Sequence, residues 1–135
     1  MTSQRTEKRP FESAYGGGFI RADQWITEKL CTHIAVRQEK ELPDRFWQQP
    51  EWAAIFRRQV QQAASLLLLF DPAVVARTLK DKRIKNIRSF KAFDMIPAWY
   101  EILQKKQFEF DAQMVAYREY LDGEKAKEGS GEESC

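Results

Sequence analysis

The sequence has few residues that carry catalytic or metal chemistry. Its 135 residues include two cysteines and one histidine. Cys31 falls within a helical pattern and Cys135 is the last residue, so the two do not form a disulfide framework. His33 lies two residues from Cys31, but these two side chains lack the further ligands that a tetrahedral zinc site needs. We therefore expect no metal and no cofactor.

Long hydrophobic runs are also lacking. The longest, AASLLLLF from Ala63 to Phe70, is interrupted by Ser65, whereas a transmembrane helix needs about 20 apolar residues. The N-terminus, MTSQRTEKRP, does not contain the apolar core of a secretory signal. With 43% hydrophobic and 31% charged residues, the composition excludes wholesale disorder and a membrane-embedded protein. We expect a soluble, intracellular (cytoplasmic) protein.

Strand patterns and enzyme motifs are missing as well. No stretch alternates apolar and polar residues over the length of a strand, and no Asn-Gly or Asp-Gly turn joins two such stretches. The glycine run 16–18 is not followed by Gly-Lys-Ser/Thr, so a flexible hinge is favoured over a phosphate-binding loop. Nucleophile-elbow, zinc-protease, deaminase and Walker motifs do not occur. The sequence gives no support for an enzyme.

Helical periodicity runs through most of the chain. Apolar residues recur at spacings of three and four in successive segments, and Pro50 and Pro72 suit the first position of a helix. The last such stripe consists of Phe110, Met114, Tyr117 and Leu121, followed by Asp122-Gly123 as a stop. We predict an all-α fold, a single compact bundle of five or six helices over residues 19–122. A flexible N-terminal arm (1–18) and a disordered polar C-terminal tail (123–135) flank it.

The stretch 77–91, RTLKDKRIKNIRSFK, concentrates positive charge. It holds seven basic residues and one acid, Asp81, although the net charge of the whole chain is only +2. One continuous helix would place Ile84 and Ile87 among four of the cations, and burying charge is costly. We therefore predict that one helix ends at about Lys80 and that a short second helix turns the two isoleucines inward.

This helix-turn-helix-like corner is the candidate nucleic-acid-binding site. Its cations suit contacts to phosphates better than base reading, because the turn lacks glycine and the second helix is short. The candidate residues are Arg77, Lys80, Lys82, Arg83, Lys85, Arg88 and Lys91. The leading hypothesis is a small, non-enzymatic accessory protein that binds the DNA or RNA backbone. The acidic tail is a candidate shield for the corner when no partner is bound.

Two alternatives explain the same features. The cations could form a solvated face that stabilises helix ends. The chain could also be a protein–protein interaction module or a homo-oligomeric subunit of a larger assembly. Ten acids against five bases from Asp94 onward, opposite in sign to the basic stretch, favour such pairing. In that case Phe46 and Trp47, in a turn bracketed by prolines, are candidate interface residues.

Overall fold

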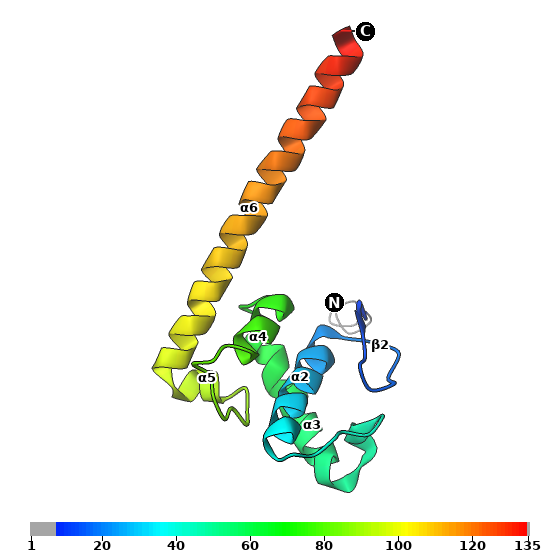
Figure 1. Ribbon diagram of the computed structural model, residues 1–135, viewed down its shortest axis with the longest axis vertical. Coiled ribbons are helices and arrows are strands. Elements are labelled where there is room, and N and C mark those ends of the chain that lie inside the picture. The colour runs from blue at the N-terminus through cyan, green and yellow to red at the C-terminus, as the bar shows by residue number, and fades with distance from the viewer. Residues whose placement is uncertain (1–7, 135) are drawn as a thin grey trace.

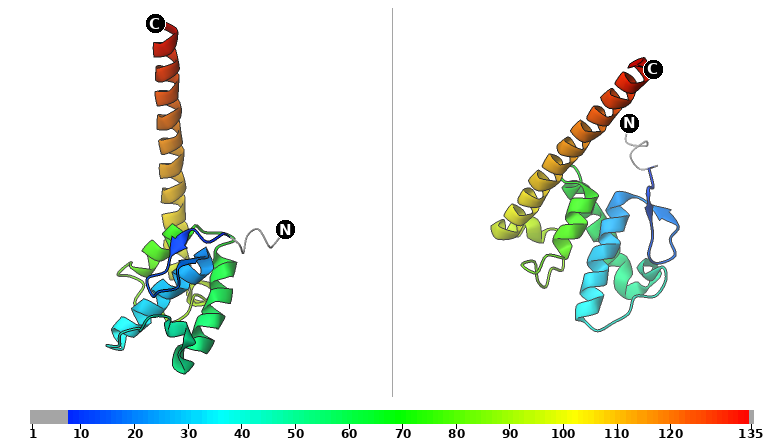
Figure 2. Two further views of the ribbon diagram at one scale, coloured as in Figure 1. Left: turned by 90° about the vertical axis from the view of Figure 1, so that its right-hand side faces the viewer. Right: turned by 45° about the horizontal axis from the view of Figure 1, so that its top comes forward.

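The fold is a compact helical body from which one long helix projects (Figure 1, Figure 2). The computed structural model describes residues 8–134, with side chains as far as residue 126. The elements in chain order are β1 (Phe11–Glu12), β2 (Phe19–Ile20), α2 (Ala22–Arg37), the 3-10 helix η1 (Phe46–Gln48), α3 (Pro50–Leu66), α4 (Pro72–Leu79), α5 (Ala92–Met95) and α6 (Pro97–Ser134). The prediction of an all-α fold is confirmed. None of the helices between residues 8 and 134 has the length and apolarity that a membrane span requires.

Helix α2 lies at the centre of the body, where it packs against both α3 and α4. Its apolar stripe of Ile26, Leu30 and Ile34 is buried, as the spacing predicts. Cys31 is buried beside them, and its burial raises the pKa of the thiol to about 12. At neutral pH the thiol is therefore protonated, and Cys31 acts as a small core residue.

The glycine run forms the tip of a small β-hairpin. Strands β1 and β2 pair antiparallel, with Phe11 opposite Ile20. Gly16 and Gly18 have φ angles of +81° and +69°, a region that glycine enters without steric cost. A two-residue pairing is too short to leave an alternating pattern, so the sequence did not indicate it. The part of the predicted flexible arm within the described residues is thus a folded hairpin, and residues 1–7 lie outside them.

The hairpin is attached to α2 by packing and by hydrogen bonds. Phe11 stacks on Trp25, with ring centroids 4.3 Å apart. The Oγ of Ser13 donates to Glu28 at 2.6 Å, and the backbone N–H of Ala14 donates to the same carboxylate at 3.2 Å. Glu28 is buried, and this burial raises the pKa of its carboxyl above the ordinary value of 4.5. These contacts hold the hairpin against α2.

Helix α6 differs most from the expectation. It is one helix of 38 residues in place of two predicted helices, and it continues through Gly123 to Ser134. A single glycine in a helix costs only about 1 kcal/mol relative to alanine, which does not by itself end a helix. In place of a disordered tail, the structure has a helix from residue 123 to residue 134. The rod carries this segment away from the body (Figure 1), so the predicted shielding of the basic corner is not seen.

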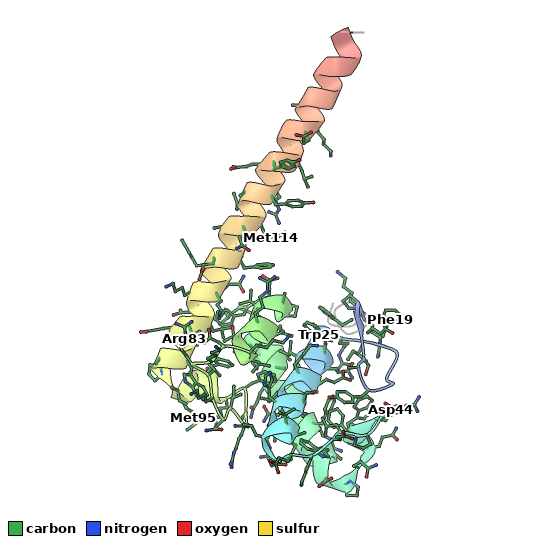
Figure 3. The ribbon with its side chains drawn as sticks, viewed as in Figure 1. Phe19, Trp25, Asp44, Arg83, Met95 and Met114 are labelled. Atoms are coloured by element: carbon green, nitrogen blue, oxygen red, sulfur yellow. The ribbon has the colours of Figure 1, made fainter. Side chains whose placement is uncertain are left out.

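The outer half of α6 exposes the apolar stripe that the sequence analysis assigned to the last helix of a compact bundle. Phe110 is half-buried, whereas Met114, Tyr117 and Leu121 are exposed. Figure 3 shows Met114 on the part of the rod that extends beyond the body. Periodicity indicated which residues share a face of the helix. It could not indicate that the helix extends beyond the body, where nothing in the described residues covers that face.

Candidate functional site

The basic stretch is a helix end followed by an irregular loop, and not a pair of helices. Helix α4 ends at Leu79, as expected, but residues 80–91 (the basic loop) contain no helix. Ile84 and Ile87 are nevertheless buried, with 4% and 2% of their surfaces exposed. Asn86 between them has a φ of +61°. This left-handed residue is incompatible with a continuing helix. The predicted second helix is therefore wrong, whereas the predicted burial of both isoleucines is confirmed.

Hydrogen bonds to α2 and α3 hold the basic loop in place. The Nη2 of Arg37 on α2 donates to the backbone carbonyl of Ile87. The Oε1 of Gln59 on α3 accepts from the backbone N–H of Phe90 at 2.9 Å, and its Nε2 donates to the Oγ of Ser89 at 3.1 Å. One of these bonds comes from α2 and the others from α3. Together they hold the backbone of the loop at Ile87 and Phe90.

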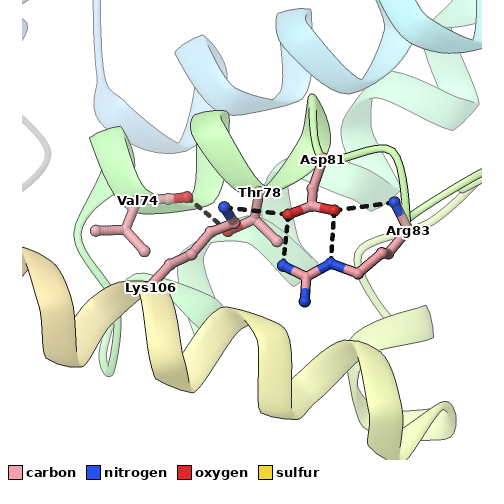
Figure 4. Close-up of polar contacts among 5 residues, drawn as sticks. All are labelled: Val74, Thr78, Asp81, Arg83 and Lys106. Atoms are coloured by element: carbon pink, nitrogen blue, oxygen red, sulfur yellow. Dashed lines mark hydrogen bonds and ion pairs between the residues drawn. The ribbon is translucent and has the colours of Figure 1, made fainter.

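A third attachment joins the loop to α6 through Asp81 (Figure 4). The Nε and Nη2 of Arg83 donate to the two carboxylate oxygens of Asp81 at 2.9 and 2.8 Å. The Nζ of Lys106 lies 3.1 Å from one of these oxygens. Hydrogen bonds from the side chain and backbone of Arg83 hold the pKa of Asp81 well below its ordinary value. Asp81 is therefore ionised at neutral pH, and its charge is shared by two cations.

The seven predicted cations are all exposed, but they do not form one patch. Arg77 lies over the ring of Phe110 on α6, with its guanidinium carbon 6.0 Å from the centroid. Arg83 is paired with Asp81. The remaining five lie in the loop: Lys80 and Lys85 face α2, Lys91 lines a second hollow beside α3, and Lys82 and Arg88 are exposed. Two of the seven, Lys80 and Lys85, therefore lie together with basic residues of α2, and the charge of Arg88 also acts on Arg37 of that helix.

Residues of α2 and the basic loop line a pocket of about 290 Å³, which we call the α2–loop pocket. Its basic lining residues are His33 and Arg37 of α2 together with Lys80 and Lys85 of the loop, and its other lining residues are Leu79, Asp81, Ile84, Asn86 and Ile87. The sequence did not single out His33 and Arg37 for this site, because they lie more than 40 residues before the loop. The only available signal was their spacing of four residues, which places them on the same face of a helix.

The pocket has a positive electrostatic environment. Burial lowers the pKa of His33 below its ordinary value of 6.5, and the nearby charges of Arg37, Lys80 and Lys29 lower it further. Burial also lowers the pKa of Arg37, and so does the charge of Arg88. The pocket-lining acid, Asp81, is already engaged by Arg83 and Lys106. The cations around His33 thus repel one another, and an anion would relieve this repulsion.

The candidate interface residues Phe46 and Trp47 lie in a cluster of aromatic rings. Phe46 is 0% exposed and makes edge-to-face contacts with Tyr15, Trp47, Trp52 and Phe56. Its ring is therefore part of the core and cannot reach a partner, which corrects its assignment as an interface residue. Trp47 is half-buried on the rim of the same cluster.

Among the side chains described, residues 8–126, no three of His, Cys, Asp or Glu lie close enough together to hold a metal ion. The fold and the α2–loop pocket thus define a small helical protein with a preformed cationic site. No protein-family model, curated protein or solved structure matches the chain. The function must therefore be argued from the site itself.

Proposed function

We propose that this protein binds nucleic acid through phosphate groups, using the basic loop and the adjoining face of α2. The observation that carries the proposal is the α2–loop pocket, which two segments distant in sequence line with four basic side chains. Cations gathered around a concave surface suit a phosphate chain, which supplies regularly spaced anions. The proposal retains the nucleic-acid hypothesis, and it moves the centre of the site from the stretch 77–91 alone to its contact with α2.

The form of the site favours phosphate contacts over base reading. A sequence-specific reader of the major groove inserts a helix or a two-stranded ribbon, whereas the basic loop is irregular and held against the body by Ile84 and Ile87. A loop held in this way can contact phosphates but cannot enter a groove deeply. We therefore expect binding that is strongly dependent on salt and weakly dependent on sequence.

Substituting the two pocket lysines tests this function. Lys80→Gln combined with Lys85→Gln removes two cations that take part in no ion pair within residues 8–126. If each lysine neutralises one phosphate, the slope of log K against log salt for duplex DNA becomes shallower by about 1.8. The measurement is fluorescence anisotropy with labelled duplex DNA, single-stranded DNA and RNA over a series of salt concentrations.

The matched control is Lys105→Gln, which removes one exposed cation from α6 outside the α2–loop pocket. This variant should bind like the wild-type protein. Absence of salt-dependent binding by the wild-type protein at low ionic strength, with all three nucleic acids, would contradict the proposed function.

The second candidate function is protein–protein interaction, and the observation that favours it is the outer half of α6. Leu103 and Phe110 of this helix pack against the core, and Met114, Tyr117 and Leu121 continue the same face beyond the body. An apolar stripe that continues without a covering element suits an amphipathic helix of a partner protein or a second copy of this chain. The molecular mass in solution, measured over a range of protein concentrations, tests this function.

A further inference from the structure

We infer that the α2–loop pocket is a receptor for a single phosphate group and that His33 takes part in holding that group. The inference deepens the proposed function, and it rests on that function for the identification of the phosphate with a nucleic-acid backbone. The same chemistry occurs in free phosphate, so the experiment has to separate the two sources.

The size and composition of the pocket fit a small anion. Its volume of about 290 Å³ lies just below the range for pockets that hold drug-sized ligands, which is about 300–1,000 Å³. Basic groups line it from two segments, and the side chain of Asn86 adds a neutral donor. Leu79, Ile84 and Ile87 supply the apolar part of the lining, and charges attract one another more strongly beside apolar groups than in bulk water.

The hydrogen bonds around the pocket fix its shape. Arg37 is tied to the carbonyl of Ile87 across the pocket, so α2 and the loop hold a constant separation. The carboxylate of Asp81 accepts hydrogen bonds from the backbone and side chain of Arg83. A phosphate that enters therefore meets one cation held in place, Arg37, and two exposed lysines that take part in no ion pair within residues 8–126. Asp81 is already paired with Arg83 and Lys106.

Phosphate binding in the pocket should be coupled to protonation of His33. It is half-buried, and the charged groups that face it are cationic except for Asp81: Lys29 and Arg37 from α2, and Lys80 and Lys85 from the segment packed against it. Burial lowers the pKa of the imidazole, and the charges of Arg37, Lys80 and Lys29 lower it further, which favours the neutral imidazole at pH 7. A bound phosphate offsets the cations, so protonation of His33 becomes easier and the proton in turn strengthens binding.

Nuclear magnetic resonance of His33 tests the inference directly. His33 is the sole histidine of the chain, so its imidazole resonance needs no assignment. The pKa of His33 is measured in the protein without ligand, with inorganic phosphate, and with thymidylyl-thymidine. Thymidylyl-thymidine carries one phosphodiester and no terminal phosphate. Thymidine and sodium chloride at matched ionic strength are the controls. The phosphodiester does not titrate between pH 5 and 8, so any change in the pKa belongs to the protein.

We expect thymidylyl-thymidine to raise the pKa of His33 more than sodium chloride does at the same ionic strength, because the salt only screens the surrounding cations. Thymidine should leave this pKa unchanged. Each unit by which the pKa of His33 rises corresponds to about tenfold tighter binding at a pH below the free and bound pKa values than at a pH above them. Lys80→Gln combined with Lys85→Gln should reduce the affinity for the phosphodiester at least tenfold, and Lys105→Gln should leave it unchanged.

The possible results of this experiment distinguish failure of the phosphate pocket from failure of the proposed nucleic-acid binding. A response to inorganic phosphate but not to the phosphodiester supports a phosphate receptor and removes nucleic acid as its source. A His33 resonance that responds to neither probe overturns the inference, even if oligonucleotides bind; in that case the proposed function stands with a different contact surface. A response that the lysine substitutions do not weaken also overturns it.

Discussion

At the scale of single residues, Asp81 determines how much positive charge the basic loop presents. Its carboxylate binds Arg83 within the loop and Lys106 on α6. The side chain of Asp81 is 9% exposed, whereas that of Arg83 is 60% exposed. The carboxylate thus fixes the loop to α6 and at the same time neutralises a cation that could otherwise contact a ligand. Stability and anion binding make opposite demands on this residue.

Asp81→Asn should therefore change the two properties in opposite directions. Without the carboxylate, Arg83 is free to contact a phosphate, and the salt slope of DNA binding should steepen by about 0.9. The folded protein should lose stability at pH 7, because the bonds to Arg83 and Lys106 are weakened. Anisotropy titrations measure the first effect and urea denaturation measures the second.

The stability difference should also depend on pH. The pKa of Asp81 is lower in the folded protein than its ordinary value of 3.8. The stabilisation that Asp81 provides is therefore present above pH 3.8 and is lost as the pH falls through the folded-state pKa. The difference in the free energy of unfolding between the wild-type protein and Asp81→Asn should therefore become smaller as the pH falls. A difference that stays constant from pH 7 down to pH 3 would show that the ion pairs do not stabilise the fold.

At the scale of secondary-structure elements, the sequence predicted helix positions better than helix ends. Pro50 and Pro72 are the first residues of α3 and α4, as their fixed φ angles and missing N–H groups suggest. The conflict between charge and burial at Ile84 and Ile87 predicted a break after α4. It did not predict the irregular loop beyond the break, because the left-handed conformation of Asn86 and the bonds of the loop to α2 and α3 leave no mark in local periodicity.

The α2–loop pocket could be predicted only in part. Seven cations in one stretch drew attention to the loop, but His33 and Arg37 lie on another element, and only folding brings them to the site. Local periodicity contains no information about such a contact between distant segments. The same limit explains Phe46, whose position between two prolines suggested an exposed turn, although the aromatic rings around it place it in the core.

Gly123 tests the continuity of α6. The residue lies within the helix, and a Cβ atom added there would meet no atom within 4 Å. Gly123→Ala should therefore increase helicity and stabilise the outer part of the rod by about 1 kcal/mol. Circular dichroism at 222 nm and hydrogen exchange of the α6 amides measure these effects. If the chain instead ends its helix at Gly123, alanine should extend the protected region from that point.

At the scale of the whole molecule, the protein consists of a body and a rod that carry different surfaces. The cationic pocket lies on the body, and the exposed apolar stripe lies on the rod. The second candidate function, interaction through α6, therefore uses a surface that the proposed nucleic-acid site does not include. The two functions can be tested independently, and one protein could have both.

Interaction between copies of α6 predicts a mass above the 15.9 kDa of one chain at high protein concentration. Met114→Ser combined with Leu121→Ser should restore the mass of one chain. Each change should cost less than about 0.5 kcal/mol of folding stability, because both side chains are exposed. Phe108→Ser is the control, since Phe108 is 74% exposed and lies on the opposite face of the helix. A wild-type mass of 15.9 kDa at every concentration would exclude self-association through the rod.

The rod also affects how this mass can be measured. A helix of 38 residues extends about 57 Å at 1.5 Å per residue, whereas a compact domain of about 100 residues has a radius of gyration of about 13 Å. Friction with the solvent is larger for such a shape than for a sphere of equal mass, so a single chain should elute early from a sizing column and resemble a dimer. Static light scattering and sedimentation equilibrium report the mass independently of friction with the solvent, so they distinguish an elongated monomer from a dimer.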